Sequence, residues 1–122
     1  MSSLMAEYQG LILFLGTGDL EAVSKFYSGV LGLPLFLDQG SCRIYAIPGG
    51  GMVGFCLHLE VVSGHRAPTV TLVSHDVDRV YRALLAAGLE TDGPPRFNPS
   101  YGIYHFFTKD PDGYTVEVQR FV

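Results

Sequence analysis

One pattern is written twice in this chain, about fifty-seven residues apart, and this repeat constrains the fold more than any other feature. In the first copy an apolar run leads to Asp19, and in the second a similar run leads to Asp76. An amphipathic stretch, a Gly-Leu pair and two strand-like runs around a turn follow each aspartate. A repeat of this length is one supersecondary unit that leaves its apolar face uncovered. The sequence therefore predicts a single domain over residues 1–122, built from modules at 10–60 and 68–122.

Local signals predict the element order β-α-β-β-β in each module. Asp19 and Asp76 stand where helix N-caps are expected, and Gly32 and Gly88 follow the amphipathic stretches as helix stops. The segment 92–101 is rich in residues that interrupt regular structure, among them one glycine and three prolines, and is predicted to be an irregular loop. Later strands are expected at residues 33–37, 42–47 and 52–60 in the first module, and near Glu90, at 103–109 and at 114–121 in the second.

Composition restricts the classes of partner and the location. The 122 residues carry a formal net charge of −4 and only eight Lys and Arg, spread along the chain, so no nucleic-acid partner is expected. The apolar run 11–15 is too short to span a membrane and lacks the flanks of a signal peptide. No membrane partner is therefore expected, and the predicted location is cytoplasmic. In that reducing compartment Cys42 and Cys56 are expected to be two thiols.

A set of short motifs occurs in a specific order along the chain. The motifs are Asp19-Leu20-Glu21, Phe26-Tyr27, Leu31-Gly32-Leu33, Asp76-Val77-Asp78, Ala87-Gly88, Asp110-Pro111-Asp112-Gly113-Tyr114 and Val116-Glu117-Val118. With these motifs the chain resembles the vicinal oxygen chelate superfamily, which contains glyoxalases, bleomycin-resistance proteins and dioxygenases. The resemblance implies an α+β fold in which two β-α-β-β-β modules form a curved mixed sheet around a cup. It also implies a homodimer and a cup that often holds a divalent metal.

The resemblance identifies where such a metal would bind. Metal-dependent relatives take His, Gln and Glu ligands from four positions, which correspond here to Ile12, Gly54, Thr69 and Glu117. Isoleucine and glycine have no donor side chain, and a neutral threonine hydroxyl is a poor substitute for imidazole or carboxylate. Only Glu117 is therefore a retained ligand position, and no metal or other cofactor is predicted.

Strand alternation selects the side chains that would face the cup. Along the last strand Val116 and Val118 should face the helices, which leaves Glu117 facing the cup, with His105 and Phe107 on the neighbouring strand. Glu117 and His105 are the candidates for acid or base catalysis. The full predicted ligand-binding set is Cys42, Cys56, His58, Tyr101, His105, Phe107 and Glu117.

Each candidate also has a structural interpretation. His105 could be a hydrogen-bonded core histidine among its aromatic neighbours, and Glu117 a remnant held by a nearby hydroxyl or by Gln119. Cys42 and Cys56 are expected diagonally across neighbouring strands, where cysteine serves as a small apolar filler.

Two functions of different classes follow from these residues. The first is a small-molecule binder of the bleomycin-resistance type that needs no catalytic metal. The alternative is a metal-dependent lyase, isomerase or dioxygenase with a relocated site around His58, His105 and Glu117. A partner-binding subunit would draw on the same aromatic residues. The sequence leaves open whether the protein is an enzyme, and the expected partners are a small organic ligand and a second copy of the chain.

Overall fold

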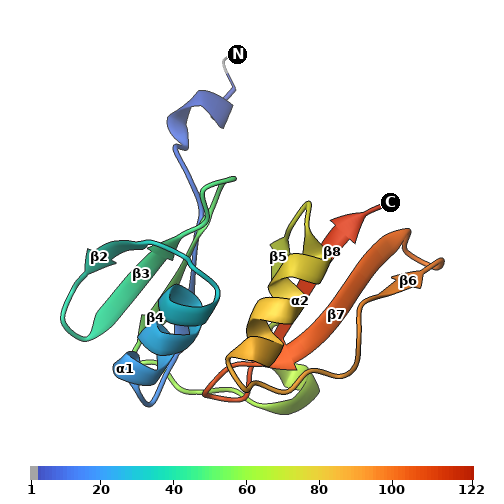
Figure 1. The fold of residues 1–122 in the computed structure, drawn as a ribbon. Coiled ribbons are helices and arrows are strands. Elements are labelled where there is room, and N and C mark those ends of the chain that lie inside the picture. The colour runs from blue at the N-terminus through green and yellow to red at the C-terminus, as the bar shows by residue number, and fades with distance from the viewer. Residues whose placement is uncertain (1–2) are drawn as a thin grey trace.

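The protein contains two four-stranded mixed sheets of the same topology (Figure 1). They are seen in a computed structural model that describes residues 3–122. In each sheet the first and last strands of the module pair in parallel and the remaining pairs are antiparallel. This arrangement confirms the predicted α+β class with a β-α-β-β-β order in each module. The strand order in the first sheet is β1 (Ile12–Gly16), β4 (Met52–Cys56), β3 (Cys42–Ala46) and β2 (Leu35–Asp38). The strand order in the second sheet is β5 (Val70–Val73), β8 (Thr115–Phe121), β7 (Ile103–Lys109) and β6 (Arg96–Asn98).

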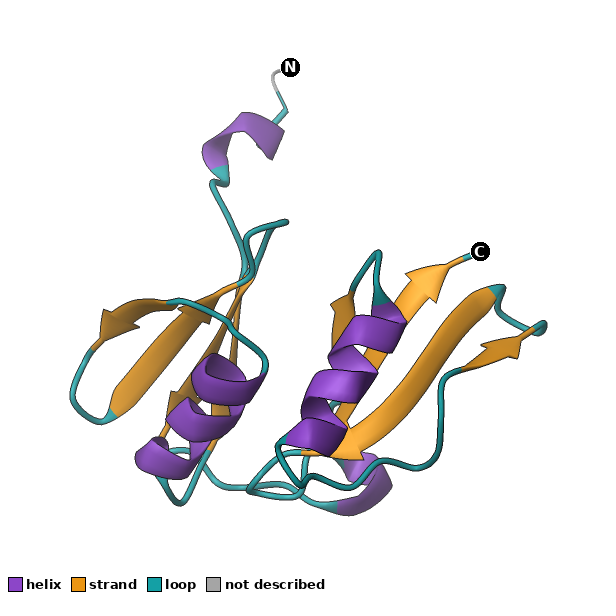
Figure 2. Ribbon diagram, viewed as in Figure 1, coloured by secondary structure: helices purple, strands orange, loops and turns teal. Residues whose placement is uncertain are grey.

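One helical segment covers each sheet (Figure 2). In the first module α1 (Leu20–Val23) continues into the π-helical segment η2 (Ser24–Val30), and in the second α2 spans Val77–Ala86. Both predicted N-caps are confirmed. The Asp19 carboxylate accepts from the backbone N–H of Glu21 and Ala22, and Asp76 accepts from that of Arg79. The short 3-10 helices are η1 (Met5–Glu7) and η3 (Gly64–Arg66). Across residues 3–122 no helix combines the length and the apolar character needed to span a bilayer.

Two strand predictions were wrong. The expected strand near Glu90 is reduced to a single bridge between Thr91 and Thr108, and β6 forms instead inside the segment predicted to be an irregular loop. The breakers of that segment flank Arg96–Asn98 without interrupting it, so these three residues pair with β7.

The expected strand at 52–60 ends early, at Cys56. The chain then turns and passes close to β1, where a Cβ on Gly16 would lie only 2.3 Å from the carbonyl oxygen of Glu60. Glycine at position 16 therefore permits the close approach of the turn that follows β4.

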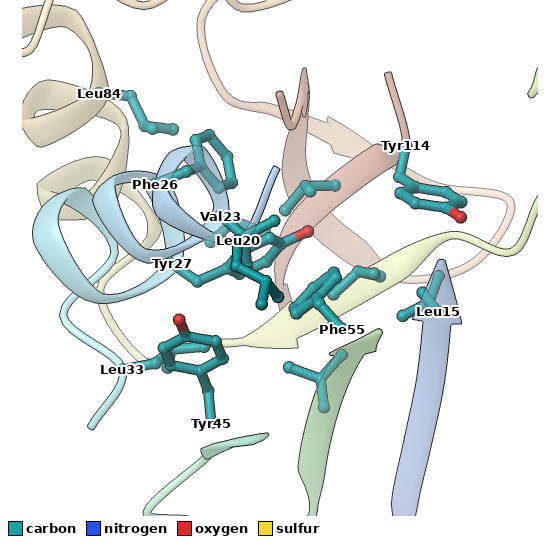
Figure 3. Close-up of a cluster of buried hydrophobic side chains, with 14 of the residues drawn as sticks. Leu15, Leu20, Val23, Phe26, Tyr27, Leu33, Tyr45, Phe55, Leu84 and Tyr114 are labelled. Carbon is teal, nitrogen blue, oxygen red and sulfur yellow. The ribbon is translucent and has the colours of Figure 1, made fainter. Parts of the chain in front are cut away.

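A single apolar core joins the two modules (Figure 3). It contains side chains from both helical segments and from the helix-covered faces of both sheets, including Tyr27, Phe55, Leu84, Phe106 and Val118. The opposite face of each sheet, here called its open face, therefore points away from this shared core.

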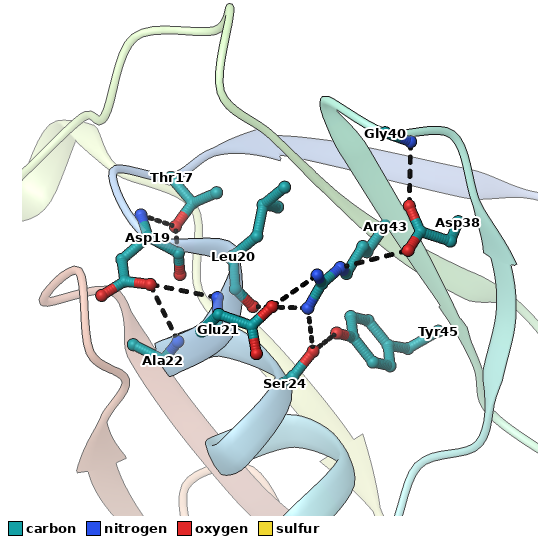
Figure 4. A network of polar contacts seen from close by, with 10 residues as sticks. All are labelled: Thr17, Asp19, Leu20, Glu21, Ala22, Ser24, Asp38, Gly40, Arg43 and Tyr45. Atoms are coloured by element: carbon teal, nitrogen blue, oxygen red, sulfur yellow. Dashed lines mark hydrogen bonds and ion pairs between the residues drawn. The ribbon is translucent and has the colours of Figure 1, made fainter.

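Arg43 fixes the first helical segment to β3 (Figure 4). Its guanidinium donates to Glu21 Oε1 at 2.6 Å, to Ser24 Oγ at 2.8 Å and to the Leu20 carbonyl at 3.3 Å. The hydrogen bond to the Glu21 carboxylate raises the pKa of Arg43 above its usual range. Since Glu21 lies in the first turn of α1, this bond orients the start of the helical segment against the sheet.

The turn between β7 and β8 connects the second module to the first. Tyr27 Oη donates to Asp110 Oδ2 at 2.7 Å, and Tyr114 Oη donates to the Gly16 carbonyl at 2.9 Å. The Asp112 carboxylate accepts from the Thr17 hydroxyl at 2.5 Å and from the Gly18 N–H at 3.0 Å. Turn residues 110–114 thereby bond to β1, to the β1–α1 connection and to the first helical segment.

Asp110 is the buried centre of this contact. Its Oδ1 also accepts from the backbone N–H groups of Asp112 and Tyr114, both at 2.9 Å, so the carboxylate shapes its own turn as well. Burial raises the pKa of Asp110, against the opposing effect of the Tyr27 hydrogen bond. Burial and the neighbouring Asp110 charge together raise the pKa of Tyr27 far above its usual value.

Replacing Asp110 with Ala should lower the free energy of unfolding by about 3 kcal/mol, because two buried donors and one part-buried donor lose their acceptor. Tyr27→Phe removes one of those bonds and should cost about 1–2 kcal/mol. Asp110→Asn keeps the shape and an acceptor oxygen, and because burial already disfavours the charge it should cost less than the alanine change. Urea unfolding of the three variants measures the order, and an alanine variant as stable as the asparagine variant would contradict it.

Candidate functional site

The residues predicted to line one cup are divided between two sheets. Cys42 and Cys56 lie on the open face of the first sheet, opposite the core residues Tyr45, Val53 and Phe55. Three predicted residues of the second module, His105, Phe107 and Glu117, lie on the open face of the second sheet. His58 lies in the exposed turn after β4 rather than on a strand, and Tyr101 is an exposed residue between β6 and β7.

A hydrogen-bonded carboxylate–imidazole pair occupies the open face of the second sheet. His105 Nδ1 lies 2.6 Å from Glu117 Oε2, and the two side chains are 7% and 12% exposed. The Thr71 hydroxyl donates to Glu117 Oε1 at 2.9 Å from the adjacent strand β5. With its amide nitrogen turned toward the carboxylate, Gln119 lies 3.3 Å and 3.2 Å from the two Glu117 oxygens. Glu117 is thus surrounded by donors.

This arrangement leaves the second ring nitrogen of His105 available. A carboxylate only accepts hydrogen bonds, so the proton between the two side chains belongs to His105 Nδ1. In the neutral ring Nε2 then carries a lone pair. Every buried side-chain nitrogen and oxygen among residues 3–122 has a protein partner, whereas His105 is bonded through Nδ1 alone. Its Nε2 has no partner and is therefore not one of the buried atoms. Because His105 lines a groove, Nε2 is open to that groove and can accept a hydrogen bond or a proton there.

The groove beside His105 has a volume of about 420 Å³, within the usual range for small-molecule sites. The Phe107 ring packs edge-on against the His105 ring with centroids 5.0 Å apart, and the Arg96 guanidinium lies over the Phe107 ring. Among residues 3–122, those that line the groove all belong to the second module: Arg96, Phe97, Asn98, Pro99, Tyr101, Ile103, His105, Phe107 and Glu117.

Asp92 holds the rim of the groove in place. Its carboxylate forms a two-point ion pair with Arg96, at 2.9 Å and 2.5 Å, and accepts from the backbone N–H of Phe107 at 2.8 Å. The Arg96 hydrogen bond lowers the pKa of Asp92. Because the charge of Arg96 is neutralised by Asp92, this guanidinium does not give the groove an unpaired positive charge.

Two site residues were missed by the sequence analysis. Thr71 of β5 lies opposite Glu117, whereas Thr69, one of the four predicted metal positions, precedes the first residue of that strand. Arg96 lies in the segment predicted to be an irregular loop, and its strand of three residues is too short to give a periodic signal.

The four inherited metal positions do not fit a metal. Beyond the missing donors, the ring of Phe14 covers Gly54 so closely that a Cβ there would lie 2.6 Å from two ring atoms. Both Glu117 oxygens already accept bonds from protein donors. Within residues 3–122 no group of three potential ligand side chains with converging ligand atoms contains Glu117.

The relocated site is not assembled in the chain either, because His58 lies beside the cysteines instead of joining His105 and Glu117. Cys42 and Cys56 form a disulfide. The expectations of two thiols and of a diagonal placement were wrong, since the register places the two cysteines directly opposite each other on β3 and β4. The sequence analysis also missed the basic residue near them, because His58 Nδ1 approaches Cys42 Sγ only through the turn after β4.

Comparisons with known proteins agree on the fold. The family model described as Glyoxalase/Bleomycin resistance protein/Dioxygenase superfamily matches residues 10–118. TioX from Micromonospora sp. ML1 is 22% identical, with 94% of this chain and 100% of that chain covered and a TM-score of 0.77. A lactoylglutathione lyase from Agrobacterium tumefaciens is 20% identical, with 92% of each chain covered and a TM-score of 0.72. A glyoxalase/dioxygenase from Nostoc punctiforme is 15% identical, with 100% and 97% covered and a TM-score of 0.77. No curated protein matches the sequence.

The neutral imidazole of His105 should carry its proton on Nδ1. The minority tautomer is selected here because Glu117 accepts from Nδ1 at 2.6 Å. Long-range proton–nitrogen NMR correlation of the imidazoles measures the tautomer, with the exposed His75 as an internal reference. Glu117→Leu should return His105 toward the reference pattern, and a wild-type His105 protonated on Nε2 would refute the assignment.

Proposed function

This chain belongs to the glyoxalase/bleomycin resistance protein/dioxygenase superfamily, and from that premise we propose that it binds a small organic molecule in the groove beside His105 without a catalytic metal. One observation carries the proposal: a buried imidazole, fixed through Nδ1 by Glu117, leaves Nε2 open to a groove of ligand size. Pockets that combine apolar surface with a few positioned polar groups are typical of small-molecule sites.

The lining of the groove indicates the chemistry of its ligand. Phe97, Tyr101 and Phe107 offer aromatic surface, while Nε2 of His105 offers an acceptor. The guanidinium of Arg96 is neutralised by Asp92, and Glu117 contributes a negative charge that is only 12% exposed. A neutral or cationic molecule with a flat apolar part and an O–H or N–H donor fits this environment better than a phosphate or a polycarboxylate.

A metal-free enzymatic role is the second candidate, and the same pair of side chains favours it. An imidazole oriented by a carboxylate is suited to general base catalysis, since Nε2 can remove a proton while the carboxylate stabilises the resulting imidazolium. In this role His105 would be the catalytic residue and Glu117 and Thr71 positioning residues. Turnover of a bound ligand, lost in His105→Gln while binding persists, distinguishes this candidate from simple sequestration.

Ligands found in a fragment screen should bind more weakly to variants of the pair. Loss of the Nε2 hydrogen bond in His105→Ala should weaken binding by about 10-fold, and Glu117→Gln should weaken it because the imidazole loses its fixed orientation. NMR titration measures the affinities with and without a chelator, which should not change them. His65→Ala, in η3, is the matched control and should bind as wild type. Ligands that ignore the first two changes would contradict the proposal.

We also propose that the protein forms a homodimer. β1 and β5 are the outer strands of their sheets at one edge, and each exposes apolar side chains, with Phe14 44% and Val73 62% exposed. Exposed apolar strand edges favour association, and a second copy could cover both edges symmetrically. Because the open faces of one chain point away from its core, a partner could also bring a first-sheet face next to a second-sheet face.

Sedimentation equilibrium should give twice the 13.3 kDa mass of the chain. Val73→Lys should shift the protein toward monomer by placing a charge on the β5 edge, whereas Leu85→Lys, at an exposed position of α2, should not. A monomeric wild type at about 100 μM would refute the dimer, since stable homodimers dissociate at far lower concentration.

A further inference from the structure

On the open face of the first sheet, a cluster of sulfur and imidazole ligands lies apart from the groove. The potential ligand atoms of Cys42, Cys56 and His58 all lie within 4.8 Å of one another. Cys42 Sγ and His58 Nδ1 are 3.8 Å apart. None of these residues lines the groove beside His105, so the proposed function does not account for the cluster.

The backbone positions all three residues. Five successive residue pairs fix the register of β3 and β4, and Cys42 and Cys56 form one of these pairs, with Cα atoms 4.1 Å apart. His58 follows Cys56 by two residues, and the turn that carries it is held by a hydrogen bond of 2.9 Å from Leu57 N–H to the Ser41 carbonyl. The same turn packs against Gly16, where no side chain larger than hydrogen fits. The sheet therefore positions Cys42 and Cys56, and the turn that follows β4 positions His58.

We propose that, once the disulfide is reduced, Cys42, Cys56 and His58 bind a Zn²⁺ ion in a Cys₂His site with its fourth position open to solvent. Two thiolates and one imidazole are the ligands that Zn²⁺ prefers in proteins. With Zn–S and Zn–N bonds of ordinary length, sulfur and nitrogen ligands of a tetrahedral ion lie about 3.6 Å apart. The observed 3.8 Å between Cys42 Sγ and His58 Nδ1 is close to this separation. The two sulfur atoms need only separate by side-chain rotation, since both strands remain in register.

The disulfide and the zinc site are alternative states of the same residues. A dithiol reductant passes two electrons and two protons to the Cys42–Cys56 bond and becomes a disulfide itself, which leaves two thiols on the protein. Zn²⁺ binding then releases the two thiol protons to solvent and forms two Zn–S bonds and one Zn–N bond. A low-molecular-weight disulfide reverses the process by accepting two electrons from the thiolates, and the ion is released. In this proposal the oxidation state of Cys42 and Cys56 controls whether the site can bind Zn²⁺.

His58 gives the clearest test because it is exposed and can be replaced without disturbing the core. Protein without a polyhistidine tag is reduced, freed of reductant and metal, and titrated anaerobically with Zn²⁺ against a chromophoric chelator. One ion per reduced chain is expected. His58→Ala should weaken binding by at least about 100-fold, while His65→Ala should leave it unchanged. Cys42→Ser and Cys56→Ser should abolish binding, and the His58 variant decides the question if either serine variant fails to fold.

The absorption spectrum with Co²⁺ and ion binding by the unreduced protein are two further tests of the proposed site. Co²⁺ in place of Zn²⁺ should give the thiolate-to-cobalt charge-transfer absorption with visible bands of a tetrahedral site, lost on addition of a small disulfide. The unreduced protein should bind no ion at this site. Zinc binding that is equal in the oxidised and reduced proteins, or equal in His58→Ala and His65→Ala, would overturn the proposal. Because the groove is on the other sheet, neither result affects the ligand-binding test.

Discussion

The turn that contains Asp110 bonds the second module to the first and sets how they pack. Its buried carboxylate accepts from Tyr27 of the first helical segment and from two backbone N–H groups of its own turn, while Asp112 and Tyr114 bond the β1 end and the connection that follows it. Each module alone would leave an apolar face exposed. These polar contacts fix how the two faces meet, and the shared core then supplies most of the stabilisation.

Joining the modules through their helix-covered sides has a direct consequence for function. The open faces point away from the common core, so the chain carries two separate surfaces instead of one enclosed cup. One surface holds an imidazole that a carboxylate orients toward a groove of about 420 Å³. The other holds two sulfur atoms and an exposed imidazole. Within one chain the proposed small-molecule site and the proposed zinc site therefore lie on different sheets.

The two open faces are related by the repeat, yet equivalent positions have acquired different chemistry. Gly54 lies opposite Phe14 as Glu117 lies opposite Thr71, and the Cys42–Cys56 pair takes the place that His105 and Gln119 take in the second module. In one module the position of an inherited ligand is filled by an aromatic ring. In the other the carboxylate is retained but its oxygens accept protein hydrogen bonds. The two modules therefore share a backbone arrangement but carry different side chains at equivalent positions.

The amino-acid sequence predicted the repeat, the β-α-β-β-β order, both helix N-caps and the core-facing sides of β7 and β8, because these follow from periodicity and from residues adjacent in the chain. It could not determine β6, whose strand exists only through pairing with β7 across a segment rich in breakers. Nor could it place His58 beside Cys42, or Thr71 beside Glu117, because those contacts depend on strand register and on a turn that Gly16 allows. The split of one expected cup into two faces was decided by the tertiary structure alone, since only the buried contacts of Asp110 and the shared core establish which sides of the modules meet.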